Sequence, residues 1–257
     1  MAYALITGAS KGIGKALAFE LAKKNFDILL TARSAALLEE VALAIKKEYD
    51  VQVHFLALDL SDQNAPQQLF NWCIENTYPI AVLANNAGFG LSGYFENIPL
   101  AETTNLLQLN IVVPTQLCSL FIPLLKQQTQ SYILNTCSSS AYQAVPMLNV
   151  YAASKAYILR FTRALKHELR DTPISVTCLS PGPTDTDWIK RANVGEKVLK
   201  MADKLNMSPQ KVAAVAVRAM LNKRTEVIVG FTNKLGAFIA WLLPDSFIEK
   251  TSASLYK

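Results

Sequence analysis

Near the start of the sequence stands Tyr3-Ala4-Leu5-Ile6-Thr7-Gly8-Ala9-Ser10-Lys11-Gly12-Ile13-Gly14, a short apolar run followed by a glycine-rich turn. The apolar run is typical of a buried β-strand, and an amphipathic, helix-length pattern begins where the turn ends. The N-terminus of a helix presents free backbone N–H groups, which bind phosphate well. Gly8 permits a tight turn, Gly12 lets a ligand approach the backbone, and Gly14 lets helix and sheet pack closely. The stretch therefore predicts a strand, a phosphate-binding turn and a helix.

The same alternation of strand and helix continues along the chain, which is the pattern of a parallel sheet covered by helices. The predicted strands are Tyr3–Thr7, Asp27–Ala32, Val51–Leu58, Ile80–Ala84, Ser131–Cys137, Ile174–Ser180 and Glu226–Val229. The predicted helices span approximately 13–24, 34–48, 62–76, 99–127, 151–170 and 208–222. We therefore expect an α/β fold: a single doubly wound, Rossmann-type domain whose parallel seven-stranded sheet is flanked by helices on both faces.

Length and composition fit one domain over residues 1–257. With 257 residues, 51% of them hydrophobic, the chain is long enough to bury one large core. Two segments differ from the rest of the chain in their pattern of polar and apolar residues. Residues 185–206 are expected to be a substrate-loop insertion, and residues 231–257 are expected to be a C-terminal apolar extension. The longest uninterrupted apolar candidate, Leu235–Leu243, has about half of the roughly 18 residues that a membrane-spanning helix requires, so no transmembrane segment is expected.

Composition also limits the classes of partner. The net charge of +5 is modest and the basic residues are spread along the chain, which disfavours nucleic acid. His54 and His167 are too few and too far apart for a metal site. The four cysteines stand singly in apolar contexts, without a C-x-x-C pair, and are expected to be reduced core thiols. A strand that begins within three residues of Met1 leaves no room for a targeting segment, so a cytoplasmic protein is expected.

The end of the second predicted strand bears on the choice of dinucleotide. An acidic residue at this position binds a ribose 2′-hydroxyl and repels a 2′-phosphate. Here the strand ends Thr31-Ala32-Arg33-Ser34, with no carboxylate and with a guanidinium whose planar geometry suits a phosphate. Lys11, inside the glycine-rich turn, adds a second positive charge. The sequence therefore favours NADP(H) as cofactor.

Acid–base chemistry is indicated by Tyr151-Ala152-Ala153-Ser154-Lys155 at the start of a long predicted helix. Residues four apart lie on one helix face, with Cβ atoms about 5–6 Å apart. An ammonium beside a tyrosine favours the phenolate and lowers a pKa that is ordinarily about 10, so Tyr151 is a candidate general acid–base near neutral pH. Ser138 directly follows the fifth predicted strand, where its hydroxyl would face the ligand crevice of an open α/β sheet.

Four motifs together resemble those of the short-chain dehydrogenase/reductase family. The glycine spacing of Gly8–Gly14 is G-x-x-x-G-x-G, Asn85–Gly88 reads N-N-A-G, Tyr151–Lys155 reads Y-x-x-x-K, and Pro181–Thr186 resembles P-G-x-x-x-T. The resemblance covers approximately residues 3 to 190, with the motifs in the family's order. It implies the fold predicted above and hydride transfer with a nicotinamide dinucleotide.

The resemblance also implies roles for single residues. Tyr151 would give or take a proton at the substrate oxygen, Ser138 would hydrogen-bond that oxygen, and Lys155 would bind the nicotinamide ribose and lower the pKa of Tyr151. Asn110, in the helix 99–127, would hold a water that links Lys155 to solvent. The implied catalytic residues are Asn110, Ser138, Tyr151 and Lys155. The implied cofactor-binding residues are Gly8, Ser10, Lys11, Gly12, Ile13, Gly14, Arg33, Asp59, Leu60, Asn86, Ala87, Gly88, Tyr151, Lys155, Pro181, Gly182, Thr184 and Thr186.

These features predict an NADP(H)-dependent oxidoreductase that transfers a hydride between the nicotinamide and a carbonyl or alcohol substrate. The expected pocket is mainly apolar and aromatic, which suits a lipophilic acyl, ring-ketone or steroid-like substrate. Its expected residues are Phe89, Tyr94, Tyr142, Val145, Met147, Trp188 and Ile189. Two alternatives stay open: a non-catalytic NADP-binding regulatory protein, which the intact catalytic set disfavours, and a membrane-surface-associated reductase.

Surplus apolar surface predicts assembly. The helices 99–127 and 151–170 resemble the pair that forms a four-helix interface in the family, so a homodimer or homotetramer is expected.

Apolar residues recur at helical spacing from Phe231 until Pro244 ends the helix. We expect this face to pack over the pocket region or on a neighbouring subunit, and we rank a lipid interface last because Lys234 is the only basic residue on the helix.

Overall fold

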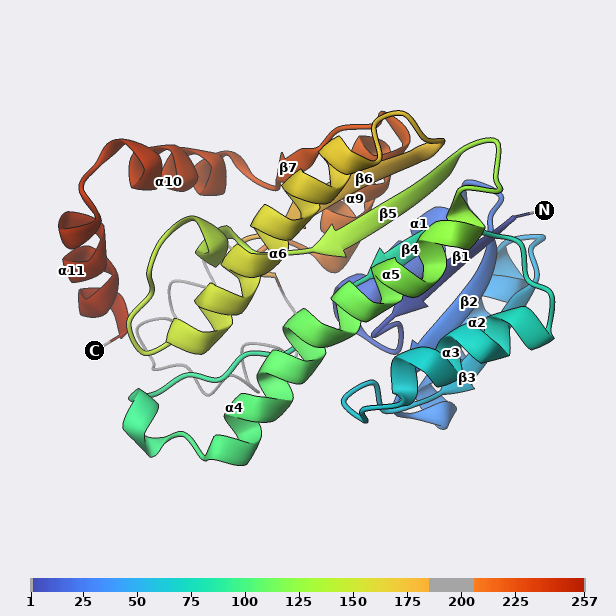
Figure 1. Ribbon diagram of the computed structural model, residues 1–257, viewed down its shortest axis with the longest axis horizontal. Coiled ribbons are helices and arrows are strands. Elements are labelled where there is room, and N and C mark those ends of the chain that lie inside the picture. Colours follow the sequence, from blue (N-terminus) through green and yellow to red (C-terminus); the bar gives the residue numbers. More distant parts are fainter. Residues whose placement is uncertain (1, 185–205, 257) are drawn as a thin grey trace.

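The computed structural model describes residues 2–184 and 206–256. Within them, seven parallel strands form one sheet in the order β3-β2-β1-β4-β5-β6-β7 (Figure 1). The strands are β1 (Tyr3–Thr7), β2 (Asp27–Ala32), β3 (Val53–Ala57), β4 (Ile80–Asn85), β5 (Ser131–Thr136), β6 (Ile174–Ser180) and β7 (Glu226–Ile228). The strand order reverses at β1, which pairs with β2 on one side and β4 on the other. The connections that follow β1 and β4 therefore cross to opposite faces of the sheet, and open α/β sheets bind ligands beside such a point, at the carboxyl ends of the strands.

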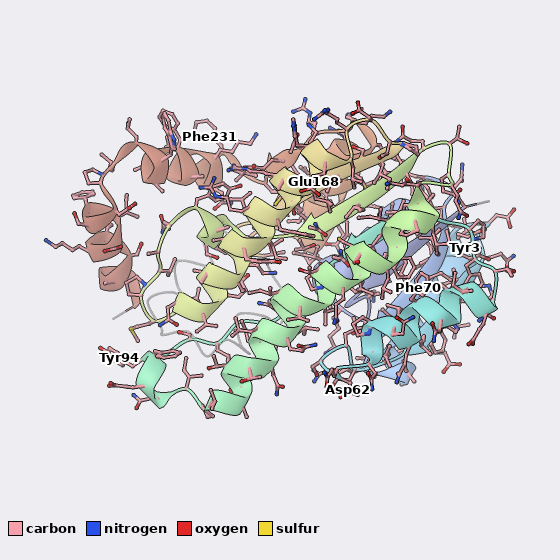
Figure 2. The ribbon with its side chains drawn as sticks, in the orientation of Figure 1. Tyr3, Asp62, Phe70, Tyr94, Glu168 and Phe231 are labelled. Atoms are coloured by element: carbon pink, nitrogen blue, oxygen red, sulfur yellow. The ribbon has the colours of Figure 1, made fainter. Side chains whose placement is uncertain are left out.

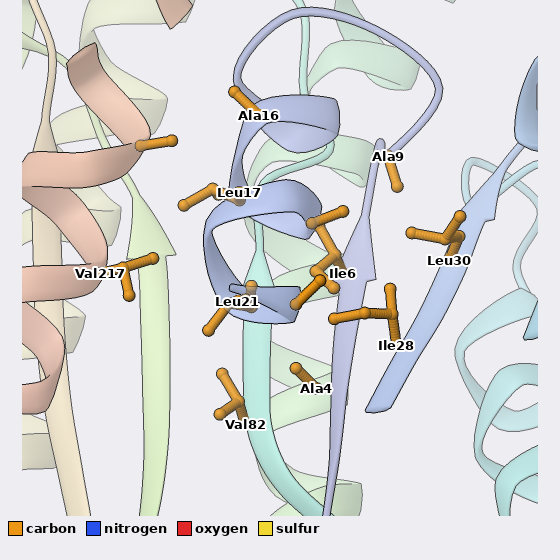
Figure 3. Close-up of a cluster of buried hydrophobic side chains, with 14 of the residues drawn as sticks. Ala4, Ile6, Ala9, Ala16, Leu17, Leu21, Ile28, Leu30, Val82 and Val217 are labelled. Atoms are coloured by element: carbon orange, nitrogen blue, oxygen red, sulfur yellow. The ribbon is translucent and has the colours of Figure 1, made fainter. Parts of the chain in front are cut away.

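Helices cover both faces of this sheet, as predicted. On one face lie α1 (Gly12–Ala22), α2 (Ala35–Glu48) and α9 (Pro209–Leu221), and on the other lie α3 (Ala65–Glu75), α5 (Val113–Leu125) and α6 (Asn149–Glu168). Beneath α1, Leu17 and Leu21 lie against Ile6 and Val82 of the sheet (Figure 3). All residues of β4 and β6 are buried, as expected for strands covered on both sides. The four cysteines are free and buried, which confirms the predicted core thiols.

The predicted helix 99–127 is not regular. It comprises α4 (Leu100–Leu107), a π-helical segment (Gln108–Val112) and α5. Pro114 has no N–H to donate to the carbonyl of Asn110, four residues earlier, so regular hydrogen bonding is lost at this point. π-helical segments frequently occur at functional sites. The other predicted elements are confirmed to within a few residues, and β1, β2 and β6 match at both ends.

One stretch within residues 2–184 and 206–256, Leu100–Leu125, has the length and mean hydropathy, 1.5, of a membrane-spanning helix. It was not expected, because polar residues interrupt its apolar pattern and leave no long uninterrupted run. In the structure, 39% of the apolar window is buried inside the protein. Its α5 portion packs against β4, β5 and α3, as a helix flanking the sheet does.

After β7 the chain forms α10 (Phe231–Leu242) and α11 (Asp245–Tyr256), which lie at one end of the molecule (Figure 1). Pro244 separates them and ends α10 as predicted, whereas the sequence pattern did not predict α11. α10 contacts the 3-10 helix η3 (Ser139–Tyr142), but most of its apolar residues are exposed. Phe231, on the outside of the molecule in Figure 2, is 79% exposed. Within residues 2–184 and 206–256, most of this face is thus left uncovered, and the expectation that it packs over the pocket region or on a neighbouring subunit stays a prediction. The predicted insertion 185–206 lies outside the described residues, apart from Asn206.

Candidate active site

The turn after β1 has the backbone that the sequence predicts. Gly8 and Gly12 have φ angles of 65° and 54°, in the left-handed region that favours glycine. A Cβ on Gly14 would lie 2.2 Å from the carbonyl oxygen of Gly8, so α1 can begin this close to β1 only with glycine there. The residue before α1, Lys11, makes no side-chain capping bond to the helix. The N–H groups in the first turn of a helix have no partner within the helix, so this turn fits a pyrophosphate.

The turn after β4 is joined to the phosphate turn. The Oγ1 of Thr7 accepts hydrogen bonds from the backbone N–H groups of Asn86 and Ala87, each at 2.9 Å. The Nδ2 of Asn86 donates to the carbonyl of Thr7 at 3.1 Å and to that of Gly8 at 3.4 Å. Asn86, predicted to bind cofactor, therefore uses its side chain to hold the two turns together. Sequence reasoning missed Thr7, whose only local signal is a hydroxyl at the end of a buried strand.

The residues expected near the adenine-side ribose lie after β2 and β3. Arg33 Nη1 is 3.9 Å from Asp59 Oδ2, and the Arg33 side chain is 71% exposed. Burial raises the pKa of Asp59, but hydrogen bonds from Ser61 and the charge of Arg33 outweigh it and hold the pKa below its usual value. Leu60 is buried in the core cluster that covers one face of the sheet. The exposed guanidinium is available to an anion, as predicted.

Tyr151 and Lys155 lie on one face of α6, as their spacing predicts. The Nζ of Lys155 is 5.7 Å from the ring centroid of Tyr151 and donates to the carbonyl of Thr136 at 3.0 Å. Lys155 is only 5% exposed, and this burial lowers the pKa of its ammonium. Among the residues that the structure describes, no carboxylate forms an ion pair with Lys155. A positive charge is thus held beside the tyrosine with only a backbone carbonyl as hydrogen-bond acceptor.

Asn110, in the π-helical segment, joins α6 to the loop after β4. Its Oδ1 accepts from the N–H of Phe89 at 3.1 Å, and its Nδ2 donates to the Phe89 carbonyl at 2.9 Å and to Ser154 Oγ at 3.1 Å. Ser154 in turn donates to the carbonyl of Tyr151 at 2.7 Å. A Cβ on Gly88 would lie 2.9 Å from Asn110 Oδ1 and 3.5 Å from Lys155 Nζ, so Gly88 packs against both. Ser154 was missed, because the positions inside Y-x-x-x-K carry no signal of their own.

Ser138 lies between β5 and η3, and its Oγ accepts from the N–H and the hydroxyl of Ser140 at 3.1 and 3.0 Å. The N–H of the next residue, Ser139, donates to the Pro181 carbonyl at 2.8 Å. This bond joins the loop that carries Ser138 to the turn after β6, where Thr184 Oγ1 donates to the Gly182 carbonyl at 3.0 Å. Thr186, Trp188 and Ile189 lie outside the described residues.

An apolar cluster adjoins the tyrosine. Its buried members are Leu106, Val145, Leu148, Tyr151 and Ala152, and Phe89, Leu91 and Val150 pack against them. Phe89 and Val145 are therefore near Tyr151, as predicted. The hydroxyl of Tyr142, which is also predicted to line the pocket, donates to Glu226 Oε1 at 2.6 Å and lies 3.0 Å from Ser180 Oγ. That bonding depends on the pairing of β6 with β7, which local sequence does not reveal.

Comparison with known proteins agrees with this arrangement. Residues 2–197 match the family described as short chain dehydrogenase. The chain belongs to the short-chain dehydrogenase family. It is 30% identical to 7beta-hydroxysteroid dehydrogenase of Clostridium sardiniense over 90% of this chain and 87% of that protein. It is 32% identical to hydroxysteroid dehydrogenase-like protein 1 of Gallus gallus over 76% of this chain, but spans only 59% of that protein's length.

Among solved structures, this short-chain dehydrogenase is similar to one from Sphingobium yanoikuyae that was determined in complex with NADPH. The TM-score is 0.83 and the identity 25%, and the match covers 94% of each chain. The parallel sheet, the flanking helices and the order of the loops at its carboxyl edge are thus those of the family.

Replacing the buried Lys155 with methionine is expected to stabilise this short-chain dehydrogenase while abolishing catalysis. Methionine fills similar space without the cost of burying an ammonium, so the free energy of unfolding at pH 7 should rise by about 1 kcal/mol or more. Burial lowers the folded-state pKa of Lys155 below the unfolded value, so the wild type regains stability as the pH rises through the window between those two values. Denaturant unfolding at pH 7 and at pH 10 measures this change. The difference in unfolding free energy between Lys155→Met and the wild type should be smaller at pH 10.

Lys47→Met, at an exposed position of α2, is the matched control and should change the unfolding free energy little at either pH. A Lys155→Met protein that is less stable than the wild type at pH 7 would contradict this account. It would mean that the bond to the Thr136 carbonyl outweighs the burial of the charge.

Proposed function

We propose that this chain is an NADP(H)-dependent oxidoreductase that interconverts a carbonyl and an alcohol on a lipophilic substrate. The observation that carries the proposal is the Lys155 ammonium, buried beside Tyr151 and adjacent to Gly88 at the carboxyl edge of the sheet. A buried charge without a carboxylate partner is costly, and such groups cluster at catalytic sites. The complete set of Asn110, Ser138, Tyr151 and Lys155 argues against a non-catalytic NADP-binding regulator.

In the direction of reduction, the bound cofactor supplies a hydride to the substrate carbon. Tyr151 supplies the matching proton to the carbonyl oxygen, and Ser138 donates a hydrogen bond to the same oxygen. The Lys155 ammonium, which packs against Gly88, favours the tyrosinate that remains after transfer and would bind a ribose hydroxyl of the cofactor. In the direction of oxidation, Tyr151 accepts the proton instead. The residues of the chain thus contribute orientation and proton transfer.

The proposed cofactor follows from charge at the adenine end. The exposed Arg33 stands where a carboxylate would select NAD(H), and Lys11 lies within the neighbouring phosphate turn. A related protein of 25% identity, from Sphingobium yanoikuyae, was solved with NADPH, which supports the same choice.

Arg33→Asp should reverse the cofactor preference. In the wild type we expect NADPH to bind at least about tenfold more tightly than NADH, which is about 1.4 kcal/mol and a modest demand on a charged contact to phosphate. The aspartate removes this contact, repels the 2′-phosphate and accepts a bond from a 2′-hydroxyl. Calorimetric titration with both cofactors measures the change, with Arg218→Asp, at an exposed position of α9, as the charge-matched control. Equal affinities in the wild type would refute the preference.

The proposed substrate class follows from the apolar cluster beside Tyr151. The partly buried members of the cluster, Phe89, Leu91 and Val150, present hydrocarbon and aromatic surface on that side. Such a wall favours an acyl chain, a ring ketone or a steroid-like body over a sugar, whose hydroxyls would lose hydrogen bonds there. The hydroxysteroid dehydrogenase named among the relatives supports this choice, although one fold hosts many substrates.

Tyr151→Phe should lower kcat for such a carbonyl by about 10²-fold or more and leave the NADPH affinity within about twofold, because only the proton-transferring hydroxyl is lost. The assay follows NADPH absorbance over a panel from acetoacetyl thioesters to cyclic ketones. Tyr157→Phe is the control on the same helix, because its hydroxyl lies by Thr115 and away from this site. More than a tenth of wild-type turnover in Tyr151→Phe would rule out the assigned role.

A homo-oligomer is also proposed, with a second copy covering the apolar face of α10. Phe231 and Trp241 are 79% and 78% exposed, an unfavourable state for a free monomer. The helix carries a single basic residue, Lys234, whereas helices that bind anionic lipid have strongly basic polar faces. The more exposed parts of α5 and α6 offer the interface that the family resemblance implies.

Light scattering should show an assembly larger than the 28.3 kDa monomer, and Phe231→Ser/Trp241→Ser should shift it to a smaller one. Leu43→Ser, at an apolar position of α2 that is 63% exposed, is the control and should leave the assembly unchanged. A monomeric wild type that cosediments with anionic liposomes would contradict the proposal and favour the membrane-surface alternative.

A further inference from the structure

Three carbonyl groups of the turn Pro181–Thr184, which follows β6, accept hydrogen bonds from protein donors. The Pro181 carbonyl accepts from the N–H of Ser139 at 2.8 Å, and the Pro183 carbonyl accepts from that of Met207 at 3.2 Å. The Gly182 carbonyl accepts from Thr184 Oγ1 at 3.0 Å. These bonds hold the carbonyl groups of the turn in place. The position of the Gly182 Cα then depends on the side chain that packs against it.

The side chain against Gly182 comes from α10. A Cβ on Gly182 would lie 2.2 Å from the Nδ2 of Asn233 and 2.4 Å from its Oδ1, so the amide occupies the space where any other residue would have a side chain. Asn233 is itself held, because its Nδ2 donates to the Val229 carbonyl at 2.7 Å and the Val229 N–H donates to the Ser180 carbonyl at 3.1 Å. The amide is therefore a fixed spacer between the first turn of α10 and the end of β6.

We propose that Asn233 is a positioning residue for the nicotinamide end of the cofactor site, acting through Gly182. The inference rests on the proposed NADP(H) function: the adenine end is proposed at Arg33, so Pro181 and Gly182, which the family resemblance implies bind the cofactor, would meet its nicotinamide end. The turn at Gly8 and the Arg33 position follow β1 and β2. In the sheet, β6 stands three strands away from β1, about 14 Å at the usual spacing. Loss of the Asn233 amide frees Gly182 and leaves the adenine end unchanged.

The test separates the two ends of the ligand. NADPH carries both, whereas adenosine 2′,5′-bisphosphate carries only the adenine-side ribose and its 2′-phosphate. In Asn233→Ala we expect the Kd for NADPH to rise about tenfold, the Kd for adenosine 2′,5′-bisphosphate to change less than about twofold, and kcat to fall, because a displaced nicotinamide loses alignment with the substrate. Thr232→Ala, at an exposed position of the same helical turn, is the control and should leave all three unchanged.

A double-mutant cycle tests the contact itself. Gly182→Ala places a methyl group against the Asn233 amide and should weaken NADPH binding. In the Asn233→Ala protein the methyl group has room, so Gly182→Ala should cause a smaller further loss of NADPH affinity there. The cycle measures the effect of Gly182→Ala on NADPH affinity separately with asparagine and with alanine at position 233. It therefore still tests the contact if Asn233→Ala lowers the melting temperature. An equal loss for both ligands in Asn233→Ala, no loss for either, or a Gly182→Ala effect of the same size in both backgrounds would overturn the inference. A wild type that binds neither ligand would instead refute the proposed function.

Discussion

Two backbone segments approach each other at the point where the strand order reverses, and the site depends on that approach. A Cβ on Gly8 would lie 2.9 Å from the Cα of Ala87, so the turns after β1 and β4 are nearly in backbone contact. The buried hydroxyl of Thr7 holds them there by accepting two backbone N–H groups. In a parallel sheet the carboxyl ends of the strands share one edge, so the two turns together form the base of the site at this edge. The loops after the neighbouring strands then lie beside these two turns.

The catalytic end is built on the same base. Gly88 continues the turn after β4 and packs between Asn110 and Lys155, which come from helices on one face of the sheet. Asn110 reaches Phe89 and Ser154 because the helix that carries it departs from regular geometry before Pro114. The irregular segment and the buried ammonium each cost stability, and both lie at the same place. Such costs concentrated at one point are typical of a site kept for chemistry rather than for folding.

The C-terminal helices add a different kind of contact. Asn233 in the first turn of α10 reaches Gly182, and Gln143 Nε2 donates to Ser252 Oγ of α11 at 3.0 Å. Both contacts are polar and lie near the active-site loops, while the apolar residues of α10 point away from the subunit. The extension is thus attached to the site by a few specific contacts rather than by a shared core. Among the described residues, little covers its apolar face, so the burial of this face is a question of assembly.

The sequence by itself determined the elements and the chemistry that is encoded locally. Strand and helix periodicity gave the seven-stranded sheet, and the spacing within Gly8–Gly14 and Tyr151–Lys155 is set by one turn or one helical repeat, which a short window contains. Only the tertiary structure decided that Thr7 holds Asn86, that Asn110 meets Ser154, that Tyr142 bonds Glu226, and that Asn233 lies on Gly182. These partners are tens of residues apart, so their contacts depend on how each helix lies on the sheet and on which strands pair. A short window of sequence determines neither the placement of the helices on the sheet nor the pairing of the strands.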